Sequence, residues 1–284
     1  LIASSGSVAI VIPPSIAMIL YGAAAEQSVP KLFIAGVFPG LLISLAMALY
    51  VLLLLRREAL RERPLPMGFL RASLYASGAL AMPLVVLLGI YLGLFSPTEA
   101  GGIACFYAIL LARFVYRSLT WGEILDAASA AALLTGQILI ILASAAVFSW
   151  LLTVQGIPQA LVAWVEALQL SPIAFLFVIN ILLLLLGCLV DPTSAILVLT
   201  PILLPMVLQL GIDPIHFGIV MTVNLSIGMF TPPFGLNLFV AQSVMDADLA
   251  ELFKGVTGFF VVQTLALLVI TYWPGLSLWL VDRV

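Results

Sequence analysis

The amino-acid sequence predicts an all-α protein that crosses a membrane several times and contains two inverted repeats, each with a broken helix. Hydrophobic residues make up 64% of the chain and charged residues only 8%, whereas soluble domains carry about 25% charged residues. Doubled prolines interrupt two apolar stretches, at Pro13–Pro14 and Pro232–Pro233. An offset of about 219 positions superimposes both proline pairs and aligns Ser7 with Ser226, which indicates a weak internal repeat.

Runs of about 20 apolar residues can span a bilayer, and such runs define the elements of the first half of the chain. A broken segment at 2–24 contains the first proline pair, and the span at 32–55 ends where an arginine-rich loop begins. A span at 72–95 tolerates one proline. The span at 100–116 follows Ser96-Pro-Thr-Glu99, which fits a capping box with proline at the first helical position. A further span is expected at 124–153.

The second half of the chain begins with a short amphipathic helix at 158–169. Two apolar arms follow at 172–189 and 194–210, separated by Val190-Asp-Pro-Thr193. Because each arm is short for a span, they predict a re-entrant hairpin at 172–211, and two full spans remain the alternative. A second broken segment at 215–245 and a last span at 253–273 complete the chain.

The distribution of basic residues predicts the topology and the domains. Seven of the ten Lys and Arg residues fall in loops at 56–71 and 113–117, so both loops are expected in the cytoplasm. The two broken helices then have opposite directions, which makes the repeat an inverted one. We expect the end of the first repeat at 1–56, a cytoplasmic Arg-rich loop at 57–71, scaffold and linking spans at 72–155, and the second repeat at 156–284.

The doubled prolines also predict the chemistry of the breaks. Proline has no N–H, so the two pairs free the carbonyls of Ala9 and Ile10 in one repeat and of Gly228 and Met229 in the other. In hydrocarbon, freed carbonyls are tolerated only where they are buried in protein or line a cavity. Broken helices at the middle of the membrane are typical of ion and substrate sites in secondary transporters, so the sequence predicts a transport protein.

Two residues beside the breaks are candidates for ion binding. Asp191 is an acid between two apolar arms, where acids are costly and functional by default. It also fits a helix N-cap with Pro192 at the first helical position, and the two roles are compatible. Thr231 precedes Pro232 in the same arrangement, so its hydroxyl can cap the second half-helix or bind Na⁺.

The remaining polar residues fit structural roles better than catalysis. Asn180 and Asn224 are expected to join helices by hydrogen bonds, while Asn237, just past the second break, is the expected substrate contact. No Ser-His-Asp set, metal-ligand spacing or phosphate-binding glycine loop is visible. The sequence therefore predicts neither an enzyme nor a nucleic-acid-binding protein.

At these residues the chain resembles the large membrane subunit of the tripartite ATP-independent periplasmic (TRAP) transporters. The matching segments run in order through nearly the whole chain and include Ile12-Pro-Pro-Ser-Ile16, Ser96-Pro-Thr-Glu-Ala-Gly-Gly102, Leu186-Gly-Cys-Leu-Val-Asp191, Gly211-Ile-Asp-Pro-Ile-His-Phe-Gly218 and Gly228-Met-Phe-Thr-Pro-Pro-Phe-Gly235. The resemblance implies an elevator-type fold in which each repeat holds a hairpin and a broken helix. The family's first hairpin is expected before Leu1, so we expect the chain to lack an N-terminal part.

The resemblance also implies the function: Na⁺-coupled import of a small organic acid, of the dicarboxylate, sialic acid or oxo-acid type, across the bacterial inner membrane. A periplasmic binding protein and a small membrane subunit are the implied partners, and Na⁺ is the coupling ion. The site residues predicted from the resemblance and from the positions of the breaks form three groups. The Na⁺ site of the second repeat comprises Asp191, Ser194, Gly228, Met229, Thr231 and Phe234; that of the first comprises Ala9, Ile10, Ile12 and Ser15; the substrate candidates are Ser7, Pro13, Pro14, Pro232, Pro233 and Asn237.

Two other functions compete with this one. A divalent-anion/Na⁺ symporter would need no binding protein, but it is expected to carry Ser-Asn-Thr at its hairpin tips, and Asp191-Pro-Thr-Ser194 lacks the asparagine. A membrane scaffold that transports nothing would have no use for two broken helices.

Overall fold

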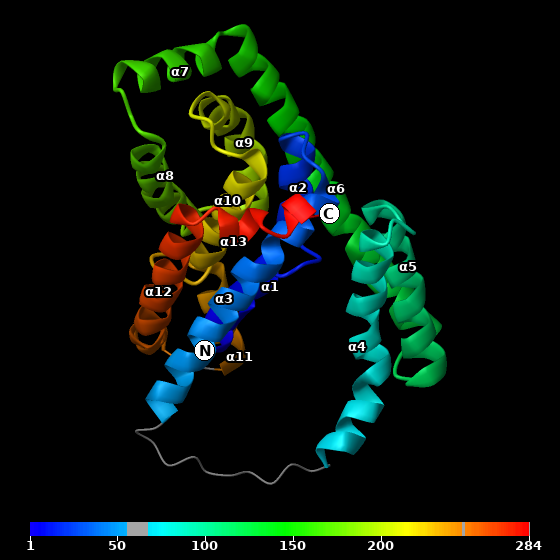
Figure 1. Ribbon diagram of the computed structural model, residues 1–284. Helices are drawn as coiled ribbons and strands as arrows, with labels where there is room; N and C mark the ends of the chain where they lie inside the picture. The colour runs from blue at the N-terminus through cyan, green and yellow to red at the C-terminus, as the bar shows by residue number, and fades with distance from the viewer. Residues whose placement is uncertain (56–67, 246–247, 284) are drawn as a thin grey trace. The chain divides into compact units, whose positions relative to one another are not determined.

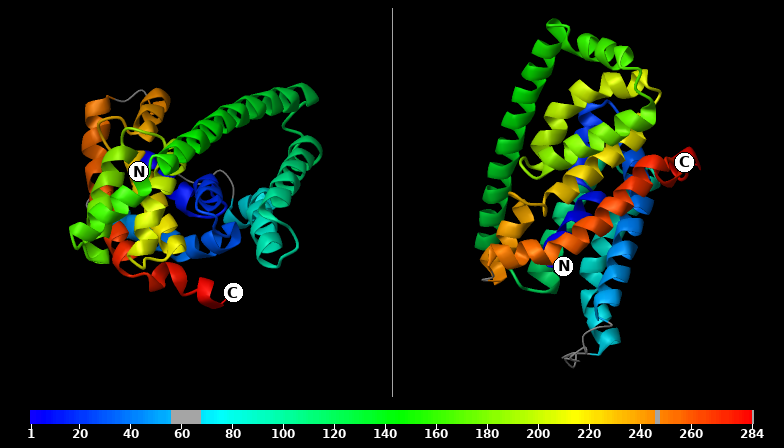
Figure 2. Two further views of the ribbon diagram at one scale, coloured as in Figure 1. Left: turned by 90° about the horizontal axis from the view of Figure 1, so that it is seen from above. Right: turned by 90° about the vertical axis from the view of Figure 1, so that its left-hand side faces the viewer.

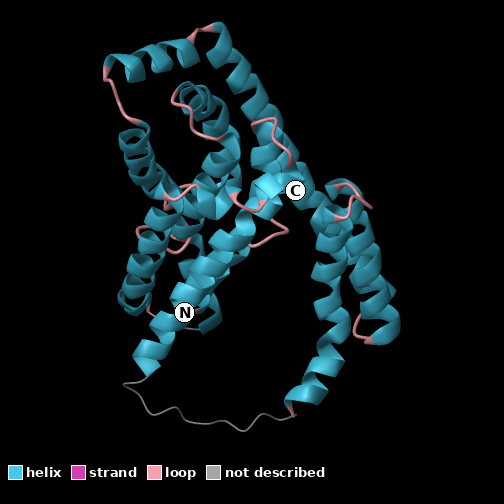
Figure 3. Ribbon diagram, in the orientation of Figure 1, coloured by secondary structure: helices cyan, strands magenta, loops and turns pink. Residues whose placement is uncertain are grey.

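The computed structural model describes residues 1–55, 68–245 and 248–283, and over these ranges it consists of helices joined by short loops, without strands (Figures 1 and 3). Six of the described helices are long and apolar enough to cross a membrane. A seventh span results if the bent pair Ile2–Val11 and Ile16–Ala24 is counted as one. The predicted all-α, multi-span fold class is therefore confirmed.

The first three helices contain the first break. α1 (Ile2–Val11) and α2 (Ile16–Ala24) are bent by 40°, and Ser15 caps α2 by accepting a hydrogen bond from the Met18 N–H. α3 (Val29–Leu55) then runs on through Pro39. The first proline pair thus ends one helix, and a serine directly after it starts the next.

The chain divides into two compact units, one of residues 57–140 and one of Leu1–Arg56 with Ile141–Val284. The first of these contains α4 (Phe69–Tyr91), α5 (Pro97–Leu110), the π-helix η1 (Leu111–Val115) and the first part of α6 (Trp121–Val154). The boundary between the units lies inside α6. Most of the predicted Arg-rich loop at 57–71 lies outside the described residues.

Tyrosine hydroxyls hold α4 against α5 and the end of η1 in the 57–140 unit. Tyr107 and Tyr116 donate hydrogen bonds to the α4 carbonyls of Gly78 and Tyr75, at 2.9 and 3.0 Å. The capping box that the sequence predicts at the start of α5 is present, with the hydroxyl of Ser96 and the carboxylate of Glu99 each accepting a backbone N–H. Local sequence rules therefore describe the turn between these two helices well.

The larger unit also contains the C-terminal helices, whose bounds follow the predicted arms, second broken segment and last span to within a few residues. They are α7 (Ile157–Ala167), α8 (Pro172–Gly187), α9 (Pro192–Gln209), α10 (Pro214–Gly228), α11 (Leu236–Met245), α12 (Leu249–Tyr272), α13 (Gly275–Leu278) and the 3₁₀-helix η2 (Val281–Arg283).

α10 forms the core of this larger unit. Every residue from Ile215 to Gly228 is buried, the polar His216 and Asn224 included. α10 packs against α1, α8, α9 and α12 among others, and α8, α9 and α10 lie next to one another in both views of Figure 2. The end of α10, where the second break begins, is therefore held by several helices.

The internal repeat is visible in the arrangement of the helices. Shifted by about 219 positions, α1, α2 and α3 fall on the end of α10, on α11 and on α12. The Tyr21 hydroxyl of α2 donates to the carbonyl of Pro214 at the start of α10, at 2.6 Å. At the other end, the Asn237 amide of α11 donates to the carbonyl of Ala3, at 3.0 Å. The two broken helices thus run antiparallel, with α2 and α11 at opposite ends of the unit (Figure 1).

Candidate functional site

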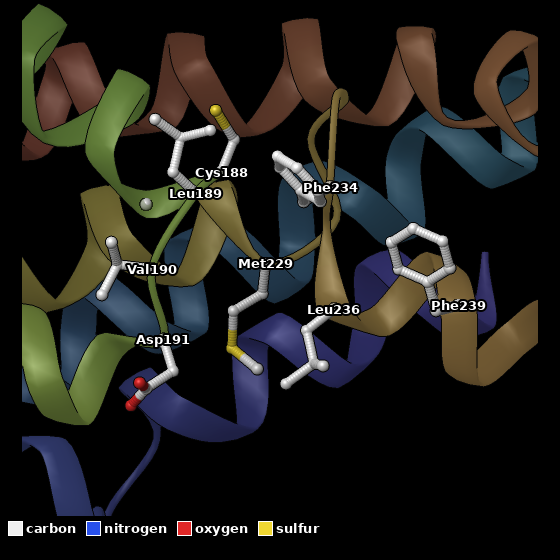
Figure 4. A pocket seen from close by; sticks show the side chains of 9 residues that line it. Cys188, Leu189, Val190, Asp191, Met229, Phe234, Leu236 and Phe239 are labelled. Carbon is white, nitrogen blue, oxygen red and sulfur yellow. The ribbon is translucent and has the colours of Figure 1, made fainter.

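The tip between α8 and α9 meets the second break in a cavity of about 240 Å³. Figure 4 shows the side chains that line it, with the Asp191 carboxylate at one end of the group and Phe239 at the other. The lining consists of one acid among mostly apolar residues: Gly187, Cys188, Leu189, Val190, Asp191, Met229, Phe234, Leu236 and Phe239. Of the residues predicted for the second Na⁺ site, the cavity brings together Asp191, Met229 and Phe234.

Asp191 occupies the N-cap of α9. One of its carboxylate oxygens, Oδ2, accepts a hydrogen bond from the Ser194 N–H at 3.0 Å, and Pro192 takes the first helical position. Both parts of the predicted arrangement are present. Because a cap uses only part of a carboxylate's acceptor capacity, the group retains oxygen lone pairs that a cation can share.

Two glycines let the tip approach the break closely. A Cβ at Gly228 would overlap the backbone of Gly187, and a Cβ at Gly187 would lie 3.2 to 3.3 Å from the Cα atoms of Leu225 and Gly228. The end of α8 therefore packs backbone against backbone on the end of α10. Gly187 was not among the predicted site residues, although it stands at the end of an apolar arm, where a glycine indicates close approach of another segment.

The second break differs from the prediction in its hydrogen bonds. The carbonyls of Gly228 and Met229 lose their helical partners, but the N–H groups of Thr231 and Asn237 replace them, at 3.0 and 2.8 Å. The Thr231 hydroxyl donates to the carbonyl of Ile227 at 2.7 Å, so it closes α10. The predicted cap of the second half-helix by Thr231 is wrong, because α11 begins only at Leu236.

The first break leaves its carbonyls open. Within the described ranges, the carbonyls of Ala9 and Ile10 accept no hydrogen bond, as the loss of two N–H groups predicts. Ala9 and Ile12 line a largely apolar groove of about 680 Å³ between α1 and α3. Ser15 is buried and caps α2. The four residues predicted for the first Na⁺ site therefore include open carbonyls at the end of α1 and a serine at the start of α2.

The predicted substrate contacts have different surroundings. Pro14, Pro232 and Pro233 are exposed, whereas Pro13 is buried. Ser7 is fully buried, and its hydroxyl donates to the carbonyl of Ser4 and to the side-chain oxygen of Gln263 in α12, at 2.7 and 3.2 Å. Ser7 thus faces α12 rather than an open cavity.

A buried amide network ties α8 to α10 and α12. Asn224 donates to the side-chain oxygen of Asn180 at 2.7 Å, and Asn180 donates to the hydroxyl of Thr271 at 3.1 Å. The ring nitrogen Nε2 of His216 lies 3.1 Å from the carbonyl of Thr271. The predicted role of Asn180 and Asn224 in joining helices is confirmed, while Thr271, a neutral polar residue in the last span, was missed.

A model of one known protein family matches nearly the whole chain. The family model described as "Tripartite ATP-independent periplasmic transporter, DctM component" matches residues 1–276. The match covers both broken helices and the arms between them.

Similar proteins are named for several different substrates. The chain is 40% identical over 280 residues to the C4-dicarboxylate TRAP transporter large permease protein DctM of Pseudomonas aeruginosa. It is 38% identical over 282 residues to the isethionate TRAP transporter permease protein DctMQ of Oleidesulfovibrio alaskensis, and 36% identical over 279 residues to the 2,3-diketo-L-gulonate TRAP transporter large permease protein YiaN of Escherichia coli. These alignments cover 97 to 98% of this chain, but 66%, 44% and 65% of the three relatives.

Proposed function

Because the chain belongs to the DctM-component family of TRAP transporters, we propose that it acts in the Na⁺-coupled import of a small organic acid. Members of this family are permeases of the bacterial inner membrane and not enzymes, and the chain has the multiple spans of such a protein. A periplasmic binding protein delivers the acid, and a small membrane subunit completes the transporter. The hairpin and the broken helices move together as the carrying part of an elevator.

The position of Asp191 is the observation that supports Na⁺ coupling. Among the described residues that line the cavity where the α8–α9 tip meets the second break, it is the one with a charged side chain. Hard cations such as Na⁺ are held by carboxylate, carbonyl and hydroxyl oxygens. We assign the second-repeat site to Asp191 and Ser194 with Gly228, Met229, Thr231 and Phe234, the carbonyls of Gly228 and Met229 each keeping one lone pair beside their present hydrogen bond.

The open carbonyls of Ala9 and Ile10 support a second cation site in the first repeat, together with Ile12 and Ser15. An unpaired carbonyl in hydrocarbon costs several kcal/mol, and a bound cation removes that cost. The substrate then binds between the two breaks, at the doubled prolines and at the side-chain oxygen of Asn237. Ser7 lies too deep to take part in this structure.

The names of similar proteins support the substrate class that we propose. Two of the three relatives above are named for carboxylate substrates and the third for a sulfonate. A C4-dicarboxylate or a related small acid is therefore the substrate that we propose. Na⁺ bound beside such an anion neutralises part of its charge.

Uptake into proteoliposomes tests this function. The full-length large subunit is reconstituted with its small subunit, and entry of labelled succinate, sialic acid and an oxo acid is measured with and without a Na⁺ gradient and binding protein. We expect uptake of one acid that requires both. Na⁺-driven uptake without the binding protein would support a simple anion symporter. No uptake of any acid, from correctly folded protein, would support a scaffold.

A further inference from the structure

Asn237 contacts both repeats at once. Its backbone N–H donates to the carbonyl of Met229, at 2.8 Å, and so closes the loop of the second break. Its side-chain amide donates to the carbonyl of Ala3 in α1, at 3.0 Å. Asn237 therefore joins the second break to a helix of the first repeat.

α1 is shaped to receive this amide. A Cβ at Gly6 would lie 3.3 Å from the Asn237 Nδ2 atom, so the glycine leaves just enough room for the side chain. α1 also packs along α11 and α10. The hydrogen bond thus belongs to a close helix contact and is not an isolated surface pair.

α1 leads directly from this contact to the first break. Ala9 and Ile10 lie about 10 Å further along the same helix than Ala3, at 1.5 Å per residue. Their carbonyls are the ones that accept no hydrogen bond within the described ranges. A short helix that is held at one end by Asn237 therefore carries open carbonyls at its other end.

We propose that Asn237 is a positioning residue that couples the two cation sites. This inference rests on the proposed function, because it requires a Na⁺ site at each break. A cation at the Met229 carbonyl orders the loop from 229 to 237 and with it the Asn237 amide. The amide in turn holds α1 in place. The first site is therefore already partly ordered, and its cation binds with a smaller loss of conformational entropy. Shared ordering of this kind produces positive cooperativity between sites.

Binding of ²²Na⁺ alone tests this coupling without knowledge of the substrate. The full-length large subunit, purified with its small subunit, is titrated with ²²Na⁺ at equilibrium. We expect a Hill coefficient clearly above one for the unaltered protein. In Asn237→Ala the coefficient should fall to about one, and the half-saturating Na⁺ concentration should rise about three- to tenfold, the effect of one neutral hydrogen bond. The amount of Na⁺ bound at saturation should not change.

Ser243→Ala is the matched control. Ser243 lies on α11 like Asn237, but its exposed hydroxyl donates only to the carbonyl of Val240 in the same helix. Its Na⁺ isotherm should match that of the unaltered protein.

Gly6→Ala tests the same contact from α1 and leaves residue 237 in place. The added methyl group displaces the Asn237 amide by a few tenths of an ångström, so the Hill coefficient should fall in the same direction but less. This variant decides the question if Asn237→Ala does not fold.

The other outcomes contradict the inference in different ways. A Hill coefficient unchanged by both variants would leave Asn237 as a substrate contact only. Loss of one bound Na⁺ at saturation in Asn237→Ala would make it a ligand and not a positioning residue. A protein that binds no Na⁺ at all would refute the proposed function, and this inference with it.

Discussion

Asp191 and Asp213 show how identical local chemistry takes on different roles. Each is followed by proline, and each caps a helix through its carboxylate. Asp213 accepts two backbone N–H groups, from Ile215 and His216, at 2.8 and 3.0 Å. Asp191 accepts one and lines the cavity at the second break. The surroundings, and not the local motif, are the reason that we propose a cation site at Asp191 and not at Asp213.

The buried amides give a prediction for stability. Asn180→Ala should destabilise the full-length protein by about 1–2 kcal/mol, because the amide of Asn224 and the hydroxyl of Thr271 then lose a buried partner. Thermal unfolding in detergent measures the change. Gln137→Ala, at an exposed position on α6, is the control and should stay within about 0.5 kcal/mol. Equal melting temperatures for the two variants would show that the network does not stabilise the fold.

Single residues were predictable where the interaction is local. The caps at Ser96 and Asp191 follow from the four residues around each, and the structure contains both. Ser7 was predicted as a substrate contact, but its hydroxyl donates to Gln263, which lies 256 positions away. A pairing of that range depends on how α1 and α12 pack, which no local pattern contains.

At the scale of elements, the second break is a packed structure rather than an open gap. The end of α8 contacts the end of α10 through Gly187 and Gly228, and the N–H of Asn237 returns to Met229. Because the tip between α8 and α9 follows directly on Gly187, this contact also positions Asp191. The geometry of the cavity therefore depends on the close contact between these two glycines.

This dependence is testable with one pair of substitutions. Gly228→Ala should destabilise the protein by about 1–3 kcal/mol, the usual effect of overpacking, and should weaken Na⁺ binding by moving the tip away from the break. Gly255→Ala is the control, since a Cβ at Gly255 meets no atom within 4 Å. Thermal unfolding and ²²Na⁺ binding of both variants provide the measurements. Wild-type behaviour of Gly228→Ala would mean that the close approach is unimportant.

The helices themselves were predictable, whereas the internal form of the breaks was only partly so. Apolar runs, prolines and caps located most ends within a few residues. The start of α11 was predicted wrongly. A threonine followed by a proline is a common helix start, and the prediction considered only these two residues, Thr231 and Pro232. In the structure the Thr231 hydroxyl turns back to Ile227, and the chain needs the residues after Pro233 to reach α11.

At the scale of the whole molecule, the two repeats support the same conclusion as the charge pattern. Tyr21 meets Pro214 and Asn237 meets Ala3, so the broken helices are antiparallel within the larger unit. The positions of the basic loops alone predict that the two broken helices have opposite directions. Two breaks of opposite direction bring two half-helix ends together, an arrangement typical of known secondary transporters.

Cysteine labelling tests the topology. After replacement of Cys105 and Cys188 by serine, single cysteines are introduced at Gln155, Asp213, Arg61 and Arg117 of the full-length protein. A membrane-impermeant reagent added outside should label the first two positions and not the last two, because basic loops stay in the cytoplasm. Labelling of Arg61 and Arg117 from outside would reverse the proposed orientation.

The Na⁺ dependence of uptake in Asp191→Asn, compared with Asp213→Asn, tests the central claim most directly. Asparagine caps helices about as well as aspartate, so both variants keep their helix starts and lose one negative charge. In proteoliposomes with all partners present, Asp191→Asn should raise the half-saturating Na⁺ concentration at least about tenfold, or abolish Na⁺-driven uptake, while Asp213→Asn behaves like the unaltered protein. An Asp191→Asn variant with unaltered Na⁺ dependence would contradict the assignment of a cation site where the tip between α8 and α9 meets the second break.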